Sequence, residues 1–278
     1  MCAIQLGVAV WLTDLGVGIA ELARTVEGAG LESLFLTEHS HVPASRVDLI
    51  QGDRPGEDAR LLDQFTALGA AAACTSRLRL GTGICVLPQH DPIALAKQVA
   101  TIDHISGGRF LFGVGAGWLV EELRNHGVDP ATRWALMEEQ LLAMKAIWTA
   151  DEAEFHGKFL DFDPIWCWPK PIQKPYPPLL VGGDSPRSLR LAALHGDAWA
   201  PVVDELGEFD RGLREWRRLR AEAGLEPGDV TVFGFDLDAE RLARFAELGV
   251  TRIVLQVPVD DADALRRRLD ELVALVSG

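Results

Sequence analysis

Apolar runs of strand length alternate with helical patterns along nearly the whole chain. The first pair is a mainly apolar run over residues 3–10 and a stretch over 17–29 that places Ile19, Leu22 and Val26 on one helical face. The same criterion predicts further strands over 33–37, 78–84, 109–115, 179–182, 198–201, 231–235 and 252–257. It predicts further helices over 61–75, 91–105 and 131–148, and helices that begin near residues 186, 206, 238 and 260. Asp91, followed by Pro92, is expected to cap the second of these helices.

These strand–helix units indicate a single domain that spans residues 1–278. The strands are almost continuously apolar, as expected when both faces of a parallel sheet are covered. Their number and spacing match a closed (β/α)8 TIM barrel better than an open, doubly wound sheet. Residues 149–178 contain six prolines and no clear periodicity. This segment is too long for an ordinary connection, so we expect an insertion over the barrel mouth.

Composition and charge exclude several classes of partner. The chain is 48% hydrophobic and carries a formal net charge of −14, so neither nucleic acid nor an anionic membrane is an expected partner. No apolar run reaches the roughly 18 residues of a membrane span, and the first residues lack a secretory pattern. We therefore expect a soluble, cytoplasmic protein. The cysteines show no disulfide or metal-ligand spacing and are expected to be reduced: Cys2, Cys74, Cys85 and Cys167.

The segment 179–186 predicts a strand, a glycine loop and a helix start. Gly182 and Gly183 let a ligand approach the backbone, Ser185 is a good N-cap, and Pro186 suits the first helical position. Amides at a helix N-terminus attract anions, which indicates a phosphate site. A simple reversal of the chain is the alternative interpretation.

In a TIM barrel, function lies where the strands end and the following loops begin. The predicted strand ends are Thr37–His39, Thr82–Ile84, Gly115–Trp118, Gly182–Ser188 and Trp199. His39, beside Glu38, is a candidate proton donor or acceptor near neutral pH, or else a hydrogen-bonded structural histidine. His41 follows closely, so two imidazoles are placed to reach one cavity. A metal is not expected, because no further ligand stands at a typical spacing.

Two neighbouring strand ends are rich in glycine. Residues 81–84 and 113–117 lack large side chains at the mouth, which is typical of a bulge or of a ligand that approaches the backbone. The second run is not a dinucleotide fingerprint, because Trp118 stands where its last glycine belongs. Together with the phosphate loop and His39, these strand ends suit a flat aromatic cofactor with a phosphorylated tail.

These motifs resemble the bacterial luciferase-like family of flavin and deazaflavin oxidoreductases. The resemblance runs in order along nearly the whole chain, and its most specific parts are Ser106–Arg109 and Gly113–Trp118. The matching segments are 35–43, 80–84, 102–118, 146–149, 155–159, 169–173, 177–185 and 196–199. The chain is most similar to the branch that uses the deazaflavin coenzyme F420.

The resemblance implies a barrel with an insertion, commonly a homodimer, and F420 or, alternatively, FMN as cofactor. In that branch the position of His39 approaches the reactive end of the cofactor, and the Gly83–Ile84 bond matches a non-proline cis peptide behind the ring. The loop around Ser185 matches the family's phosphate contacts. The implied cofactor-binding residues are Thr82, Gly83, Ile84, Gly115, Ala116, Gly117, Trp118, Gly182, Gly183, Asp184, Ser185 and Ser188.

Three departures limit what the resemblance implies. Trp118 replaces the acidic residue of the deazaflavin sugar-phosphate dehydrogenases, so their substrate is not expected here. Ala116 replaces a phosphate-pairing arginine of the luciferases, which weakens FMN as a tight cofactor without excluding it. Glu38 replaces a frequent aspartate, and its longer side chain is expected to shift the His39 ring.

The resulting hypothesis is an F420-dependent oxidoreductase that transfers hydride between C5 of the cofactor and a small organic substrate. His39, assisted by Glu38, is the expected proton carrier. Trp118, Trp166 and Trp168 are expected to wall the substrate pocket, although the last two also suit the core of the insertion. An FMN-dependent monooxygenase and a non-catalytic flavin-binding protein are the alternatives. An aldolase is disfavoured, because no lysine stands at a predicted strand end.

Overall fold

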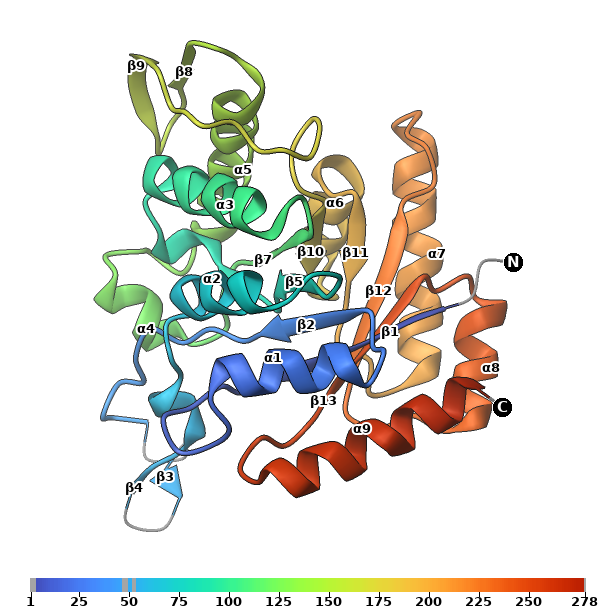
Figure 1. The fold of residues 1–278 in the computed structure, drawn as a ribbon. Helices are drawn as coiled ribbons and strands as arrows, with labels where there is room; N and C mark the ends of the chain where they lie inside the picture. The colour runs from blue at the N-terminus through green and yellow to red at the C-terminus, as the bar shows by residue number, and fades with distance from the viewer. Residues whose placement is uncertain (1–3, 47–49, 52–53, 278) are drawn as a thin grey trace.

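A computed structural model describes residues 4–46, 50–51 and 54–277 and contains a closed parallel β-barrel (Figure 1). The strands follow the order β10-β11-β12-β13-β1-β2-β5-β7, and β7 pairs with β10 to close the barrel. Their bounds are β1 (Gln5–Val10), β2 (Ser33–Leu36), β5 (Arg79–Thr82), β7 (Phe110–Gly115), β10 (Leu179–Gly182), β11 (Ala198–Ala200), β12 (Asp229–Gly234) and β13 (Arg252–Gln256). The predicted (β/α)8 TIM barrel is confirmed.

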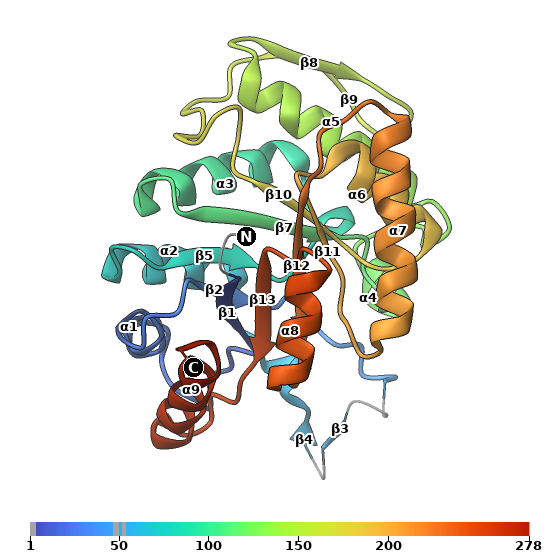
Figure 2. The ribbon, with the colours of Figure 1, turned by 90° about the vertical axis from the view of Figure 1, so that its right-hand side faces the viewer.

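Helices follow the barrel strands and cover their outer face; Figure 2 shows α1, α2 and α3 on one side of the barrel, with α7 and α8 on the other. Their bounds are α1 (Ile19–Gly28), α2 (Gln64–Cys74), α3 (Pro92–Ser106), α5 (Arg133–Thr149), α6 (Pro186–His195), α7 (Leu206–Glu222), α8 (Ala239–Glu247) and α9 (Ala262–Ser277). The carboxylate of Asp91 accepts from Ala94 N at 2.8 Å, and the Ser185 hydroxyl accepts from Ser188 N at 3.2 Å. The predicted caps of α3 and α6 are therefore confirmed.

The insertion does not cover the barrel mouth as expected: it forms a hairpin of β8 (Ala153–His156) and β9 (Asp161–Ile165) beside α5 (Figure 1), and none of its residues lines the cavity at the mouth. Phe155 and Phe162 stack across it with their ring centroids 6.4 Å apart. Glu139 of α5 accepts hydrogen bonds from the backbone N–H groups of residues 158–160. These bonds hold the hairpin turn against α5.

Shorter elements lie at the barrel mouth. β6 (Cys85–Val86) pairs with β7 beyond the end of β5, and α4 (Val120–Asn125) follows β7. The connection from β2 to α2 contains β3 (Ile50–Gln51), β4 (Arg54–Pro55) and a 3-10 turn at Glu57–Arg60, and another such turn spans Leu87–Gln89. None of these elements was predicted, because each is shorter than the window in which a period is recognisable.

Phe35 of β2 and Phe233 of β12, which two other strands separate, meet in the barrel interior. Phe35 and Phe233 meet edge to face with their centroids 5.3 Å apart. The other side chains of this cluster are smaller: Ala9, Leu111, Leu180, Ala198, Ala200 and Val254. A Cβ on Gly81 would lie 2.3 Å from Cε1 of Phe35, so this glycine makes the room that the ring occupies. The interior is therefore a packed core rather than a pore.

Two further expectations concern the cysteines and the absence of a membrane span. Cys74, Cys85 and Cys167 have free thiols, whereas Cys2 lies outside the described residues. In the part of the chain that the structure describes, no helix is both long and apolar enough to cross a bilayer.

The interior packing predicts opposite effects on stability for two glycine-to-alanine substitutions. Gly81→Ala should lower the free energy of unfolding by about 1–3 kcal/mol, because its methyl group overlaps the Phe35 ring. Gly69→Ala, in α2, should raise it by about 0.5–1 kcal/mol, because a Cβ there meets no atom within 4 Å and alanine favours the helix. Urea unfolding of both variants measures the difference. Effects of the same sign would contradict this packing.

Candidate active site

A cavity of about 740 Å³ opens at the carboxyl ends of the barrel strands, where the topology predicted function. The loops after β2, β5, β7 and β10 form most of its wall. The predicted site residues that line it are Glu38, His39, Gly83, Ile84, Gly115, Ala116, Gly117, Trp118, Gly182, Gly183, Asp184, Ser185 and Ser188. The structure therefore brings together predicted site residues as far apart in the sequence as Glu38 and Ser188.

Several residues singled out in the sequence lie outside this cavity, among them Trp199, which is buried beside the loop after β10. Thr82 is fully buried in the barrel wall, where its hydroxyl donates to the carbonyl of Gly113 at 2.6 Å. Trp166 and Trp168 are 79% and 52% exposed on the insertion, so the expectation that they wall the pocket was wrong. His41 bonds instead to Ser40 Oγ at 2.9 Å and to Asn125, so only one of the two imidazoles reaches the cavity.

The glycines at the strand ends have a packing role. A Cβ on Gly115 would lie 2.0 Å from Cδ1 of Ile84, and a Cβ on Gly182 would lie 3.0 Å from the same atom. The Ile84 side chain thus fills the space that these two strands leave free. The Gly83–Ile84 peptide is cis, as the resemblance implied.

The loop between β10 and α6 forms one end of the cavity, at the N-terminus of α6. Gly183 has a φ of +98°, a conformation that favours glycine, and its carbonyl accepts from Nε1 of Trp199 at 2.8 Å. Ser185 caps α6, and the buried Ser188 hydroxyl donates to the carbonyl of Ser185 at 2.8 Å. The role of Ser188 in this arrangement is to brace the loop, so that the first turn of α6 faces the cavity in a fixed position.

Arg133 is a cavity residue that sequence reasoning missed. It stands at the start of α5, and its guanidinium donates to the carbonyl of Pro130 at 2.5 Å. Its buried Nε has no hydrogen-bond partner among the described residues. Trp134, also on the cavity wall, approaches Gly183 closely: its Cη2 lies 3.8 Å from the position of a Cβ there. A cation with an unused donor thus lies in the same cavity as the α6 loop.

His39 is paired with Glu122, a residue of α4 that the sequence did not single out. The His39 Nδ1 lies 2.8 Å from Oε2 of Glu122, and Ser40 donates to Oε1 through its backbone N–H at 2.8 Å. The Glu122 side chain is only 1% exposed. Trp118 packs edge to face against the imidazole, with the ring centroids 5.7 Å apart.

The pair favours the charged forms of both groups. Burial alone would lower the pKa of His39, but the hydrogen bond and the charge of Glu122 outweigh it and raise that pKa. Burial alone would raise the pKa of Glu122, but the hydrogen bond and charge of His39 lower it to about 2. Glu122 is therefore ionised and fixes the Nδ1–H of His39. The other ring nitrogen, Nε2, is left to exchange a proton with a ligand.

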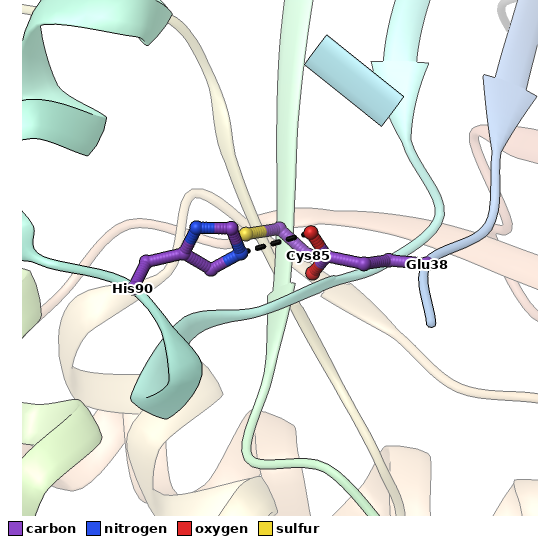
Figure 3. Close-up of side chains that lie close together, drawn as sticks. All are labelled: Glu38, Cys85 and His90. Carbon is purple, nitrogen blue, oxygen red and sulfur yellow. Dashed lines mark hydrogen bonds and ion pairs between the residues drawn. The ribbon is translucent and has the colours of Figure 1, made fainter. Parts of the chain in front are cut away.

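Glu38 has a different partner from the one expected. Its carboxylate accepts from Val86 N at 2.5 Å and lies 2.8 Å from Nε2 of His90 (Figure 3). Glu38 also raises the pKa of the fully buried Cys85, after the larger effect of burial itself. Burial tends to lower the pKa of His90, but the bond and charge of Glu38 produce a net rise. Glu38 thus orders the segment after β5, and its charge acts on His39 only as a minor influence.

Comparison with known proteins identifies the family. The family model for luciferase-like monooxygenases matches residues 17–235. A protein of Mycobacterium tuberculosis described as uncharacterised is 38% identical over 274 residues, which cover 95% of this chain and 96% of that protein. The chain therefore belongs to the luciferase-like monooxygenase family.

Two solved structures share the fold over 99% of this chain and 98% of their own. An F420-dependent secondary alcohol dehydrogenase, in complex with an F420–acetone adduct, matches with a TM-score of 0.82 and 18% identity. The oxygenating constituent of 3,6-diketocamphane monooxygenase from Pseudomonas putida, in complex with FMN, matches with a TM-score of 0.80 and 17% identity. At such identities the likeness establishes the barrel, which this chain shares with one F420-dependent and one FMN-bound neighbour.

The geometry of the pair predicts how His39 titrates. Glu122→Gln should lower the pKa of His39, because the negative charge is removed while the burial of the imidazole remains. The variant should also lose about 1–3 kcal/mol of stability near pH 6, because a buried charge-assisted bond is broken. Histidine NMR titration and urea unfolding measure the two effects.

Glu121→Gln is the matched control, because Glu121 directly precedes Glu122 in α4 but its side chain is 42% exposed. Its substitution should leave the pKa of His39 close to that of the wild-type protein. An unchanged pKa of His39 in Glu122→Gln would show that the pair does not control this histidine.

Proposed function

We propose that this protein is an F420-dependent oxidoreductase that transfers hydride between the deazaflavin and a small organic substrate. The observation that carries the proposal is one cavity with an anion-attracting end and a proton-carrying end. The first end is the loop after β10, and the second is His39 after β2. Along the shorter way round the barrel, β5 and β7 separate these strands. A cofactor that joins a flat redox ring to a phosphate fits this arrangement.

The residues present suit such a group. The first turn of α6 and the amides near Gly183 would bind the phosphate, and the guanidinium of Arg133 would supply the local positive charge. This local charge is needed because the chain as a whole carries a net charge of −14. The ring would lie against Ile84 and the backbone of Gly115–Gly117, where no large side chain projects into the cavity. Trp118 would border the substrate beside His39.

A reduced deazaflavin, when bound, supplies a hydride from C5. His39 performs the matching proton step: its imidazolium donates from Nε2 to the substrate oxygen, and its neutral form accepts the proton in the reverse direction. Glu122 holds the ring by its Nδ1–H and stabilises the imidazolium. The raised pKa increases the share of His39 that is protonated near neutral pH, which suits reduction of a carbonyl group.

An FMN-dependent monooxygenase is the second candidate. Arg133 favours it, because this residue places a cation in the cavity, whereas Ala116 stands where the luciferases have a phosphate-pairing arginine. The fold it shares with the diketocamphane monooxygenase supports it as well. Consumption of oxygen by the protein with reduced FMN would distinguish this activity from hydride transfer.

Titration of the apoprotein with F420 and with FMN tests the choice of cofactor. We expect F420 to bind with a Kd below about 100 μM, equivalent to about −5.5 kcal/mol or better, and more tightly than FMN. Fluorescence of the deazaflavin reports the binding. The absence of F420 binding in this range would contradict the proposal, and tight FMN binding instead would favour the monooxygenase.

His39→Asn tests the proton step. It should reduce turnover by about 10²–10⁴-fold while it leaves the Kd of F420 within about threefold of the wild-type value. Oxidation of reduced F420 by a panel of small carbonyl compounds measures the turnover. His41→Asn is the matched control, because it removes an imidazole two residues away that lies outside the cavity. Full turnover in His39→Asn would remove this histidine from the chemistry.

A further inference from the structure

Two hollows flank the cavity at the end where the phosphate loop lies. One has a volume of about 480 Å³ and shares Asp184 and Val202 with the cavity. The other has a volume of about 450 Å³ and shares Trp134 with it. A ligand whose phosphate lies at the start of α6 therefore has two directions in which its tail can continue.

The charges of the two hollows are opposite. The first, which we call the acidic hollow, is bordered by carboxylates and one arginine: Asp184, Asp204, Glu205, Glu208, Glu215 and Arg211. The second, which we call the basic hollow, is bordered by the cations Lys158, Arg187 and Arg190 and by the carboxylates Glu138 and Glu139. An anionic tail is repelled from the first and attracted to the second.

Both carboxylates of the basic hollow already have partners. Oε1 of Glu138 lies 2.9 Å from Nε2 of His195. The Glu139 carboxylate accepts from the backbone N–H groups of residues 158–160, which hold the hairpin turn. By contrast, no carboxylate among the described residues lies within ion-pair distance of Lys158, Arg187 or Arg190. These exposed cations are therefore available to a ligand.

We propose that the basic hollow binds the anionic oligoglutamate tail that F420 carries beyond its phosphate. Arg187 and Arg190 stand one turn apart on the helix whose N-terminus faces the phosphate position, and the Trp134 ring lies between the cavity and the hollow. Lys158 contributes the third cation from the insertion hairpin. This inference rests on the proposed function and adds a subsite to it.

The subsite also bears on the choice between the two cofactors. FMN ends at its phosphate and has no tail to place in this hollow. An oligoglutamate chain offers one carboxylate after another, and spaced guanidinium groups bind such a chain by charge-assisted hydrogen bonds. The attraction is exposed to solvent, so added salt weakens it.

Equilibrium titration with two forms of the cofactor, one with a long glutamate tail and one without glutamate, tests the subsite. The wild-type protein should bind the long-tailed form about tenfold more tightly than the tail-free form. The double variant Arg187→Gln/Arg190→Gln should lose most of that preference and keep its Kd for the tail-free form within about twofold. Deazaflavin fluorescence gives the Kd values, and circular dichroism checks that each variant is folded.

Arg211→Gln/Arg214→Gln is the matched control. It removes the same charge from two exposed arginines at the same spacing on α7, on the side of the acidic hollow, and should keep the preference for the long tail. Equal binding of both forms by the wild-type protein would overturn the subsite while leaving the proposed function intact. Failure of the wild-type protein to bind even the tail-free form would overturn the proposed function, and the subsite with it.

Discussion

The geometry of the site depends on the hydrogen bonds that the buried carboxylate of Glu122 accepts. A charge that is 1% exposed is costly unless it is fully hydrogen-bonded, and here His39 and Ser40 supply those bonds. They tie the loop after β2 to α4, which follows β7. The contribution of Glu122 to stability is present above its usual pKa of 4.5 and is lost as the pH falls towards 2. The contribution of His39 to stability is present below its usual pKa of 6.5, and it is lost as the pH rises through the raised pKa that His39 has in the folded protein.

The two ends of the cavity use different physical means. At the α6 end, the proposed anion site consists of backbone amides at a helix N-terminus, and the buried side chains of Ser188 and Trp199 fix the loop that presents them. At the β2 end, a side-chain pair controls one proton. The interior of the barrel below is closed by Phe35 and Phe233, so a ligand is confined to the mouth. This division matches a cofactor that is anchored at one end and reactive at the other.

The sequence predicted what depends on local patterns. The strand and helix periods and the caps at Asp91 and Ser185 were all recognisable, because each is determined within a few neighbouring residues. The β8–β9 hairpin was missed, since its strands are short and β9 contains Pro164. Most residues predicted at the cavity by the strand-end rule line it. Thr82, whose side chain points into the wall, and Trp199, which is buried beside the loop after β10, do not.

The partners of those residues were not predictable in the same way. Glu122 lies 83 residues from His39 on a six-residue helix with no clear period, so nothing in the sequence links the two. Glu38 was expected to act with its neighbour His39, but adjacent residues on an extended segment point in different directions, and its partner is His90. Trp166 was misjudged for a similar reason, because an aromatic side chain does not by itself show which surface it faces.

A crystal structure of the protein with bound F420 is the most direct test of the central claim, that one cavity binds a phosphate at α6 and presents a redox ring to His39. The account predicts a phosphate group within hydrogen-bond distance of the Gly183–Ser185 loop and of Arg133, with C5 of the ring on the side of His39 Nε2. A phosphate bound at any other edge of the barrel, or an imidazole turned away from the ring, would contradict it.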